Sequence, residues 1–181
     1  MARKTRIWYP GAMYHVMCRG HRGQAIFVDN EDRRVFLNRL LHAISDHSCN
    51  ILSYCLMTNH VHLQVETSQV ELWKMMKQLN MMYAIFFNKR YDYVGPLFQG
   101  RYRADLIRSL ARRLEVSRYI HLNPVAAKLV TTPLDYPWSS YSVYMGVGED
   151  PVVSPERLLE SPLEQRERYQ RYVENDRGQT P

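Results

Sequence analysis

The sequence contains no apolar run near the ~20 residues that a helix needs to cross a bilayer. Its charged first residues lead into no apolar stretch of the kind found in signal peptides. Its 3 cysteines are odd in number and form no Cys-x-x-Cys pair, so we expect buried free thiols. No internal repeat or low-complexity segment interrupts the chain. These absences predict a cytoplasmic protein that does not bind membranes.

The composition is that of a folded globular protein. Of 181 residues, 45% are hydrophobic and 12% aromatic, which is enough for one domain with a real core. Residues 1–148 hold 19 basic and 10 acidic groups, whereas residues 149–181 hold 5 and 8. We therefore expect one domain over 1–148 and a short helical tail over 149–181. The basic body favours a polyanionic partner, although a solvated surface with an ordinary basic bias would look the same.

Hydrophobic periodicity predicts an alternation of strands and helices. Asp29 or Asn30 is placed to cap the first helix, and Thr58-Asn59 is expected to form a tight turn. Because the residue before proline resists the helical conformation, the third helix should end at Asn123-Pro124. The expected strands are 12–19, 51–57, 60–66 and about 101–107. The expected helices are 31–47, about 69–90 and 110–122.

The order β-α-β-β-α-β is that of the ferredoxin-like split arrangement. It predicts an α+β fold with a four-stranded antiparallel sheet and two helices on one of its faces. The other face would be left free for a site. The helix at 110–122 is an addition to this arrangement.

Two histidines share one side of the strand expected at 60–66. Side chains alternate along a strand, so His60 and His62 point to the face opposite the apolar Val61, Leu63 and Val65. Two imidazoles at this spacing can bind one cation, but two surface histidines at a hairpin would show the same pattern. No second His-x-His pair and no His-Glu-x-x-His group is found, although zinc hydrolases need further ligands of this kind.

A tyrosine lies on one face of the helix expected at 110–122. Residues four apart share a helix face, so Glu115, Tyr119 and Asn123 project in one direction. A helical tyrosine is usually a packing residue with its hydroxyl at the surface. Composition singles out none of the 13 tyrosines, so the pattern alone does not assign a role to Tyr119.

Four segments carry a resemblance to a known family when they are taken together and in order. They are Tyr14-His15-Val16-Met17-Cys18-Arg19-Gly20, Met57-Thr58-Asn59-His60-Val61-His62-Leu63, Phe98-Gln99-Gly100-Arg101-Tyr102 and Tyr119-Ile120-His121-Leu122-Asn123-Pro124-Val125. This set resembles the HUH single-tyrosine transposases of bacterial insertion sequences, above all their REP-associated tyrosine transposase branch. The resemblance runs from about residue 5 to residue 146.

The resemblance implies a chemistry for named residues. His60 and His62 match the metal-binding histidines, Tyr119 matches the nucleophile, and Asn123 matches the place of a third metal ligand. Members of the family have the same ferredoxin-like sheet, use Mg²⁺ or Mn²⁺, and cut and rejoin single-stranded DNA near hairpins through a 5′-phosphotyrosine. By this resemblance, residues 1–148 would be the catalytic domain.

Arginines and lysines are spread over several segments that would face such a substrate. Contacts of this kind neutralise phosphates and make affinity depend on salt. In the resembling branch, the N-terminal arm helps to read a guide tetranucleotide beside the hairpin. The sequence does not decide between a monomer and a homodimer, but the resemblance to the REP-associated branch favours the monomer. The residues expected to bind DNA are Arg3, Lys4, Arg6, Arg19, Arg22, Arg101, Arg103 and Arg118.

Three other functions stay open at this point. An HUH nickase that starts replication or conjugation would use similar groups, usually in other arrangements and in larger chains. A His-x-His metal hydrolase of small molecules would account for the histidine pair but for neither the basic body nor the tyrosine helix. A non-catalytic DNA-binding regulator derived from a transposase would keep the fold without the reaction.

Overall fold

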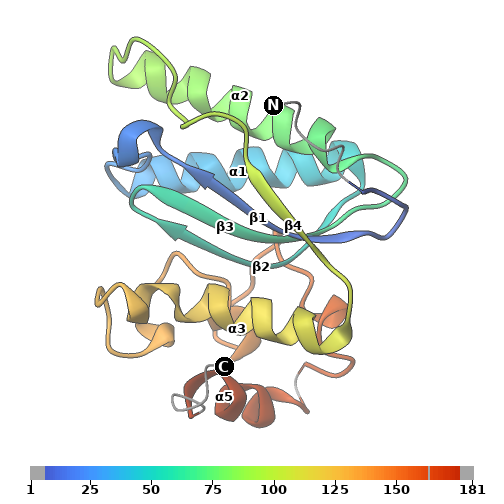
Figure 1. Cartoon of the computed structure of the whole chain (residues 1–181). Helices are drawn as coiled ribbons and strands as arrows, with labels where there is room; N and C mark the ends of the chain where they lie inside the picture. Colours follow the sequence, from blue (N-terminus) through green and yellow to red (C-terminus); the bar gives the residue numbers. More distant parts are fainter. Residues whose placement is uncertain (1–6, 163, 176–181) are drawn as a thin grey trace.

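The computed structural model describes residues 7–162 and 164–175. Its centre is a four-stranded antiparallel sheet in the order β2-β3-β1-β4, which confirms the α+β class (Figure 1). The strands are β1 (Met13–Arg19), β2 (Asn50–Met57), β3 (His60–Glu66) and β4 (Arg103–Ile107). The helices are α1 (Asn30–His47), α2 (Leu72–Arg90), α3 (Leu110–Ala126), α4 (Tyr141–Tyr144) and α5 (Arg166–Glu174). Short 3₁₀ turns are η1 (His21–Gly23), η2 (Pro133–Asp135) and η3 (Pro155–Arg157).

Local sequence signals set several of these boundaries. Asp29 caps α1 by accepting a hydrogen bond from the backbone N–H of Asp32, and the Asp32 side chain completes the capping box. Thr58 and Asn59 form the turn between β2 and β3, as expected. The bounds of β3 are those predicted from its alternating pattern.

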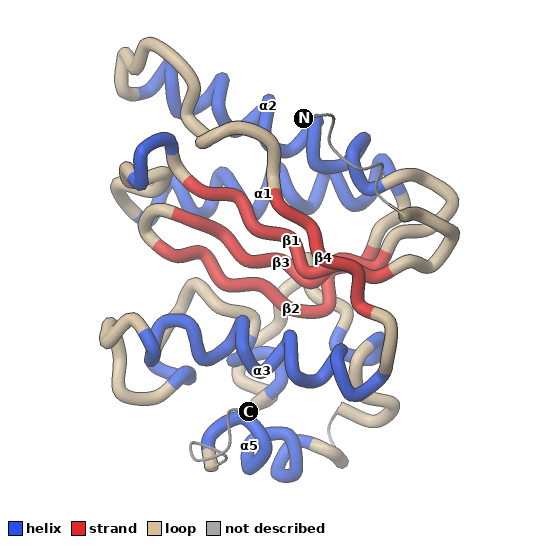
Figure 2. Tube along the Cα trace, in the orientation of Figure 1, coloured by secondary structure: helices blue, strands red, loops and turns tan. Residues whose placement is uncertain are grey.

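The sheet lies between two helical layers. Helices α1 and α2 cover one face, and α3 lies across the other (Figures 1 and 2). The Gln64 side chain on β3 donates to the backbone oxygen of Arg113 on α3 at 3.2 Å, so the polar side of β3 faces α3. The sequence left this second face free; the structure shows that α3 covers part of it.

Three predicted boundaries were wrong. Helix α2 begins at Leu72 instead of about residue 69, and β4 begins at Arg103, so Arg101 lies before the strand. Helix α3 does not end before Pro124 but continues to Ala126. Proline removes one backbone donor, yet its ring is buried here, and Ala127 N still bonds Asn123 O at 2.9 Å. Packing and the last hydrogen bonds outweigh the local preference.

The segment after α3 packs against the sheet and forms part of the core. Leu56 N donates to Trp138 O at 2.9 Å and Ser140 N to Tyr54 O at 3.1 Å, so this segment pairs with the outer edge of β2. Covering an edge strand in this way satisfies its backbone groups. Further along, Val153 of the tail is buried against the same core.

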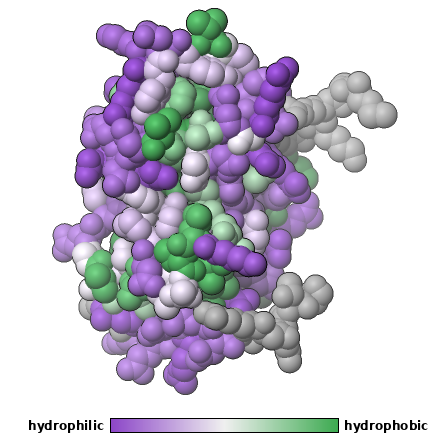
Figure 3. Space-filling model, turned by 90° about the vertical axis from the view of Figure 1, so that its left-hand side faces the viewer, coloured by the Kyte–Doolittle hydropathy of each residue, from purple (hydrophilic) through white to green (hydrophobic). Residues whose placement is uncertain are grey.

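All 3 cysteines are free and buried, as predicted. None of the described helices is long and apolar enough to cross a membrane. On the face seen in Figure 3, apolar side chains occur in small groups among polar ones.

Candidate active site

Three histidines meet on the side of the sheet that faces α3. His60 and His62 come from β3, and their ring centroids are 5.0 Å apart. His15 comes from the neighbouring strand β1, and its Nε2 lies 2.9 Å from Nδ1 of His62. The planes of the His15 and His62 rings are 25° apart, with centroids 5.1 Å apart. The alternation of the two strands thus brings the predicted pair and one further imidazole to the same place.

Helix α3 carries Tyr119 over these imidazoles. Tyr119 is 53% exposed, and its ring centroid lies 5.4 Å from that of His62 and 5.6 Å from that of His15. One turn further on, the Asn123 side chain donates to the Tyr119 backbone oxygen at 2.8 Å and also hydrogen-bonds His60. Because α3 continues past Pro124, Asn123 stays on the same helix face as Tyr119.

Burial keeps these imidazoles neutral. Desolvation lowers the pKa of His62 to about 3, with smaller contributions from His15 and His60. The pKa of His60 is lowered by burial and by the Arg19 charge, against the opposing effect of its hydrogen bond with Asn123. Burial also lowers the pKa of His15. Near neutral pH each ring therefore offers a lone pair, which is the form that binds metals.

The donor set fits a single divalent cation. His62 uses Nδ1 toward His15, which leaves its Nε2 for a metal ion. His60 uses Nδ1 to bond Oδ1 of Asn59 at 2.7 Å, so its Nε2 is the nitrogen that would face the metal. The hydrogen bond between His60 and Asn123 brings an amide beside the first imidazole. Within residues 7–162 and 164–175, no three His, Cys, Asp or Glu side chains form a metal-binding group. Here the third protein ligand would be the amide of Asn123.

The cationic residues predicted to bind DNA are in several places. Arg19 ends β1 opposite His60, while Arg22 and Arg101 are exposed in turns. Arg103 is exposed and pairs with Asp105 at 3.1 Å. Arg118 Nε donates to the backbone oxygen of Tyr172 on α5 at 2.9 Å. The predicted arm residues Arg3, Lys4 and Arg6 lie outside the described residues.

The sequence did not predict that His15 belongs to this cluster. The alternation of β1 places His15 on the α3 side of the sheet, as the alternation of β3 does for His62. Their contact depends on the pairing register, in which His15 lies opposite Gln64 and Met17 opposite His62. A hydrophobic pattern gives the side of each strand but not this register, so only the strand pairing itself could have indicated the contact.

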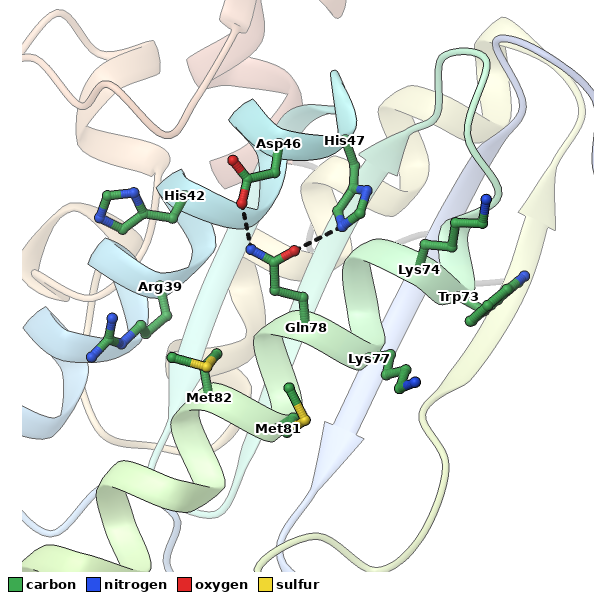
Figure 4. Close-up of a pocket in the computed structure, with 10 residues that line it drawn as sticks. All are labelled: Arg39, His42, Asp46, His47, Trp73, Lys74, Lys77, Gln78, Met81 and Met82. Atoms are coloured by element: carbon green, nitrogen blue, oxygen red, sulfur yellow. Dashed lines mark hydrogen bonds between the residues drawn. The ribbon is translucent and has the colours of Figure 1, made fainter.

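A separate hollow lies between α1 and α2, on the side of the sheet opposite to the histidine cluster (Figure 4). Its volume is about 680 Å³, and Arg39, Lys77 and Trp73 contribute to its lining. Its central polar groups already satisfy one another. Gln78 donates to Asp46 at 2.6 Å, and its amide oxygen lies 2.8 Å from Nε2 of His47. The polar centre of the hollow is thus already hydrogen-bonded, and Tyr119 lies beside His15 and His62 instead, so the histidine cluster is the better candidate.

Comparisons with known proteins agree with the fold. The family model described as "Transposase IS200 like" matches residues 9–123. Among solved structures, the chain is similar to one described as the REP-associated tyrosine transposase bound to a REP hairpin, with a TM-score of 0.68 and 15% identity. That match covers 85% of this chain and 92% of the other, and at this identity it shows a common fold.

Two further structures are more distant. A candidate transposase from Deinococcus radiodurans R1 gives a TM-score of 0.47 and 17% identity, covering 66% of this chain and 95% of the other. The tRNA(His) guanylyltransferase of Saccharomyces cerevisiae gives 0.49 and 9%, covering 97% and 85%. Neither similarity is close enough to support an argument. A comparison with curated proteins gives no match.

Proposed function

Because the chain belongs to the IS200-like transposase family, we propose that it cleaves and rejoins single-stranded DNA beside hairpins, with Tyr119 as the nucleophile. Membership of this family implies a DNA cleavage and transfer enzyme. One observation carries the finer assignment. Tyr119 is exposed and lies beside His15 and His62 of its own chain, at ring distances of 5.6 and 5.4 Å. The solved relative described as bound to a REP hairpin supports hairpin DNA as the substrate.

The proposed step is a transesterification at phosphorus. The phenolate oxygen of Tyr119 attacks the scissile phosphate, and the bond from phosphorus to the 3′ oxygen breaks. The departing oxygen takes up a proton, which leaves a free 3′-hydroxyl and a 5′-phosphotyrosine. Because one phosphoester replaces another, a 3′-hydroxyl can attack in the reverse direction and join a strand without ATP. Covalent attachment therefore suits strand transfer better than hydrolysis does.

The residues around Tyr119 suit this step. His60, His62 and Asn123 would hold a divalent ion such as Mg²⁺ or Mn²⁺, which supplies Lewis-acid neutralisation of the phosphate charge when it is bound. Imidazole and amide ligands suit several divalent metals, so the ligand set does not name the ion. Arg19 is exposed beside His60 and is placed to bind a neighbouring phosphate.

We also propose that the chain acts as a monomer. The phenol and the histidines of one chain already lie together, so no exchange of helices between subunits is needed. In this proposal, residues 1–148 form the catalytic domain on a ferredoxin-like βαββαβ frame. The tail would then help to hold α3 in position, because α5 contacts α3 through Tyr169 and Tyr172.

The decisive test uses a labelled single strand that carries a hairpin. Tyr119→Phe should abolish cleavage and the covalent protein–DNA adduct, while binding stays within about twofold, because only the hydroxyl is removed. The matched control is Tyr9→Phe, which removes the hydroxyl of another exposed tyrosine and should cleave normally. Mass spectrometry of the trapped adduct should find the phosphate on Tyr119.

The outcomes separate the competing functions. Full cleavage by Tyr119→Phe would end the proposal for the nucleophile. Tight hairpin binding without cleavage by the wild type in Mg²⁺ and Mn²⁺ would favour a DNA-binding regulator. Cleavage of small esters or amides that depends on His60, without any DNA adduct, would favour a metal hydrolase.

A further inference from the structure

Either His15 or His62 can be the donor of the hydrogen bond between them, and the choice fixes which nitrogen of His62 keeps a lone pair. Two imidazole nitrogens at 2.9 Å form a hydrogen bond only if one carries the proton and the other carries a lone pair. If His62 Nδ1 is the donor, its Nε2 keeps a lone pair. If His15 Nε2 is the donor, a neutral His62 carries its own proton on Nε2 and cannot use that nitrogen as a ligand. His15 therefore bears on whether His62 can bind a cation.

The neighbouring histidine shows which arrangement is consistent. His60 Nδ1 lies 2.7 Å from Oδ1 of Asn59, an oxygen that can only accept, so His60 donates from Nδ1 and keeps its lone pair on Nε2. The same proton placement on His62 gives two neighbouring rings with matching lone pairs. Ligating histidines in proteins usually donate their other N–H to a fixed acceptor in this way.

From this geometry we propose that His15 is a positioning residue that accepts the Nδ1 proton of His62 and so fixes the tautomer and ring plane with which His62 presents Nε2 to a divalent cation. The inference rests on the proposed function, because it takes His60 and His62 as the ligands of that cation. His15 itself makes no bond to the metal in this proposal.

Three features hold His15 in this arrangement. Its ring plane lies within 25° of that of His62 while the two rings share a hydrogen bond, so the pair constrains rotation as well as protonation. The Tyr119 ring makes an edge contact with both the His15 and the His62 imidazole. His15 also comes from a central strand paired on both sides, with Gln64 on β3 and Asp105 on β4. A rigid strand thus supplies the acceptor.

The test compares two substitutions that differ in one property. His15→Leu has a similar bulk but no acceptor, whereas His15→Gln puts an amide oxygen near the position of Nε2. Met17→Leu is the matched control, since Met17 lies on the same side of β1, opposite His62, and contributes no acceptor nitrogen. Thermal unfolding of all three variants checks that each is folded.

The first readout is the tautomer of His62 in the metal-free protein, from long-range ¹H–¹⁵N correlation spectra at pH 7. The wild type and His15→Gln should show the proton on Nδ1, and His15→Leu should shift it toward Nε2. The second readout is Mn²⁺ affinity, followed by the electron paramagnetic resonance signal of the free ion. His15→Leu should weaken binding about 10- to 100-fold, with His15→Gln recovering most of it.

The results separate this inference from the proposed function. A wild-type His62 protonated on Nε2 overturns the inference, and so does Mn²⁺ affinity in His15→Leu equal to that of Met17→Leu. The proposed metal site fails instead if His60→Ala binds Mn²⁺ like the wild type. The proposed nucleophile fails if Tyr119→Phe still cleaves. Because the tautomer is measured without metal or DNA, it decides the inference in each of these cases.

Discussion

His62 and His121 lie on opposite sides of α3, are buried to a similar degree, and differ in which ring nitrogens their hydrogen bonds leave free. On the sheet side near Tyr119, His62 is 2% exposed; on the tail side, His121 is fully buried. Burial lowers the pKa of each to about 3. A strongly perturbed histidine is often taken as a sign of a functional site. Here the same shift occurs on both sides of one helix.

The difference lies in the hydrogen bonds. Both ring nitrogens of His121 are used: Nε2 bonds the Ser140 hydroxyl at 2.8 Å and Nδ1 bonds the Tyr169 hydroxyl at 2.9 Å. Tyr169 also bonds Ser117 at 2.5 Å, which ties α3 to α5. His62 uses only Nδ1 in this way, toward His15. Burial therefore does not distinguish a structural histidine from a candidate ligand. What distinguishes them is a ring nitrogen without a hydrogen bond, here Nε2 of His62, beside an exposed tyrosine.

The largest effect should come from His62→Ala on the sheet side. Loss of one ligand and of the imidazole beside Tyr119 should lower the cleavage rate by about 100- to 1,000-fold, because the phosphate charge is less well neutralised. Stability should fall as well, since His62 is buried and bonds His15, so cleavage is compared at a temperature where the variant is folded. Single-turnover cleavage of the hairpin strand and urea unfolding measure the two quantities. A rate within threefold of the wild type would remove His62 from the site.

The corresponding change on the tail side, His121→Ala, should act on stability. It leaves the Ser140 and Tyr169 hydroxyls without their partner and opens a cavity in the core, which should cost about 2–4 kcal/mol. At a temperature where the variant is folded, cleavage should fall less than about tenfold. A loss of cleavage as large as that of His62→Ala in folded protein would break the distinction between His62 and His121.

Acid should reveal His121 through the pH dependence of stability. The unfolded chain takes up a proton on this histidine below about pH 6.5, but the folded protein does not until about pH 3. Between these values the unfolded state binds more protons, so stability is present above pH 6.5 and is lost as pH falls. The contribution is at most about 1.4 kcal/mol per pH unit.

The variant His121→Gln isolates this contribution, since an amide does not titrate. Urea unfolding at pH 6 and pH 4.5, in EDTA, should show a shallower loss of stability in the variant than in the wild type. The other histidines are the same in both proteins, so their contributions cancel to a first approximation. Parallel slopes would mean that His121 titrates normally and is not buried as described.

Much of the sheet side was predictable because its determinants are local. The alternation that places His60 and His62 together is written in one strand, and the four-residue spacing of Tyr119 and Asn123 is written in one helix. These patterns depend only on the period of each element. The assignment of Tyr119 among 13 tyrosines still needed the family resemblance, because no local rule selects it.

The rest depends on contacts between distant segments. The register that joins His15 to His62 comes from strand pairing, and the continuation of α3 through Pro124 comes from packing. The tail side joins residues 48 positions apart in His121 and Tyr169. Periodicity and spacing carry no information about such pairs. For the same reason, the sequence does not indicate that the Arg118 guanidinium bonds α5.

The smallest effects should separate two arginines on the two sides of α3. Arg19 is exposed beside His60, so Arg19→Ala should weaken hairpin binding a few-fold and reduce the slope of log affinity against log salt by about 0.7, the value for one phosphate contact on a single strand. Arg118→Ala should leave that slope unchanged and lower stability by about 1 kcal/mol, because it loses a hydrogen bond to Tyr172. Fluorescence anisotropy at several salt concentrations measures both slopes. If Arg118→Ala reduced the slope as much as Arg19→Ala, the DNA would have to reach the tail side of α3, and the division between a reacting side and an anchoring side would not hold.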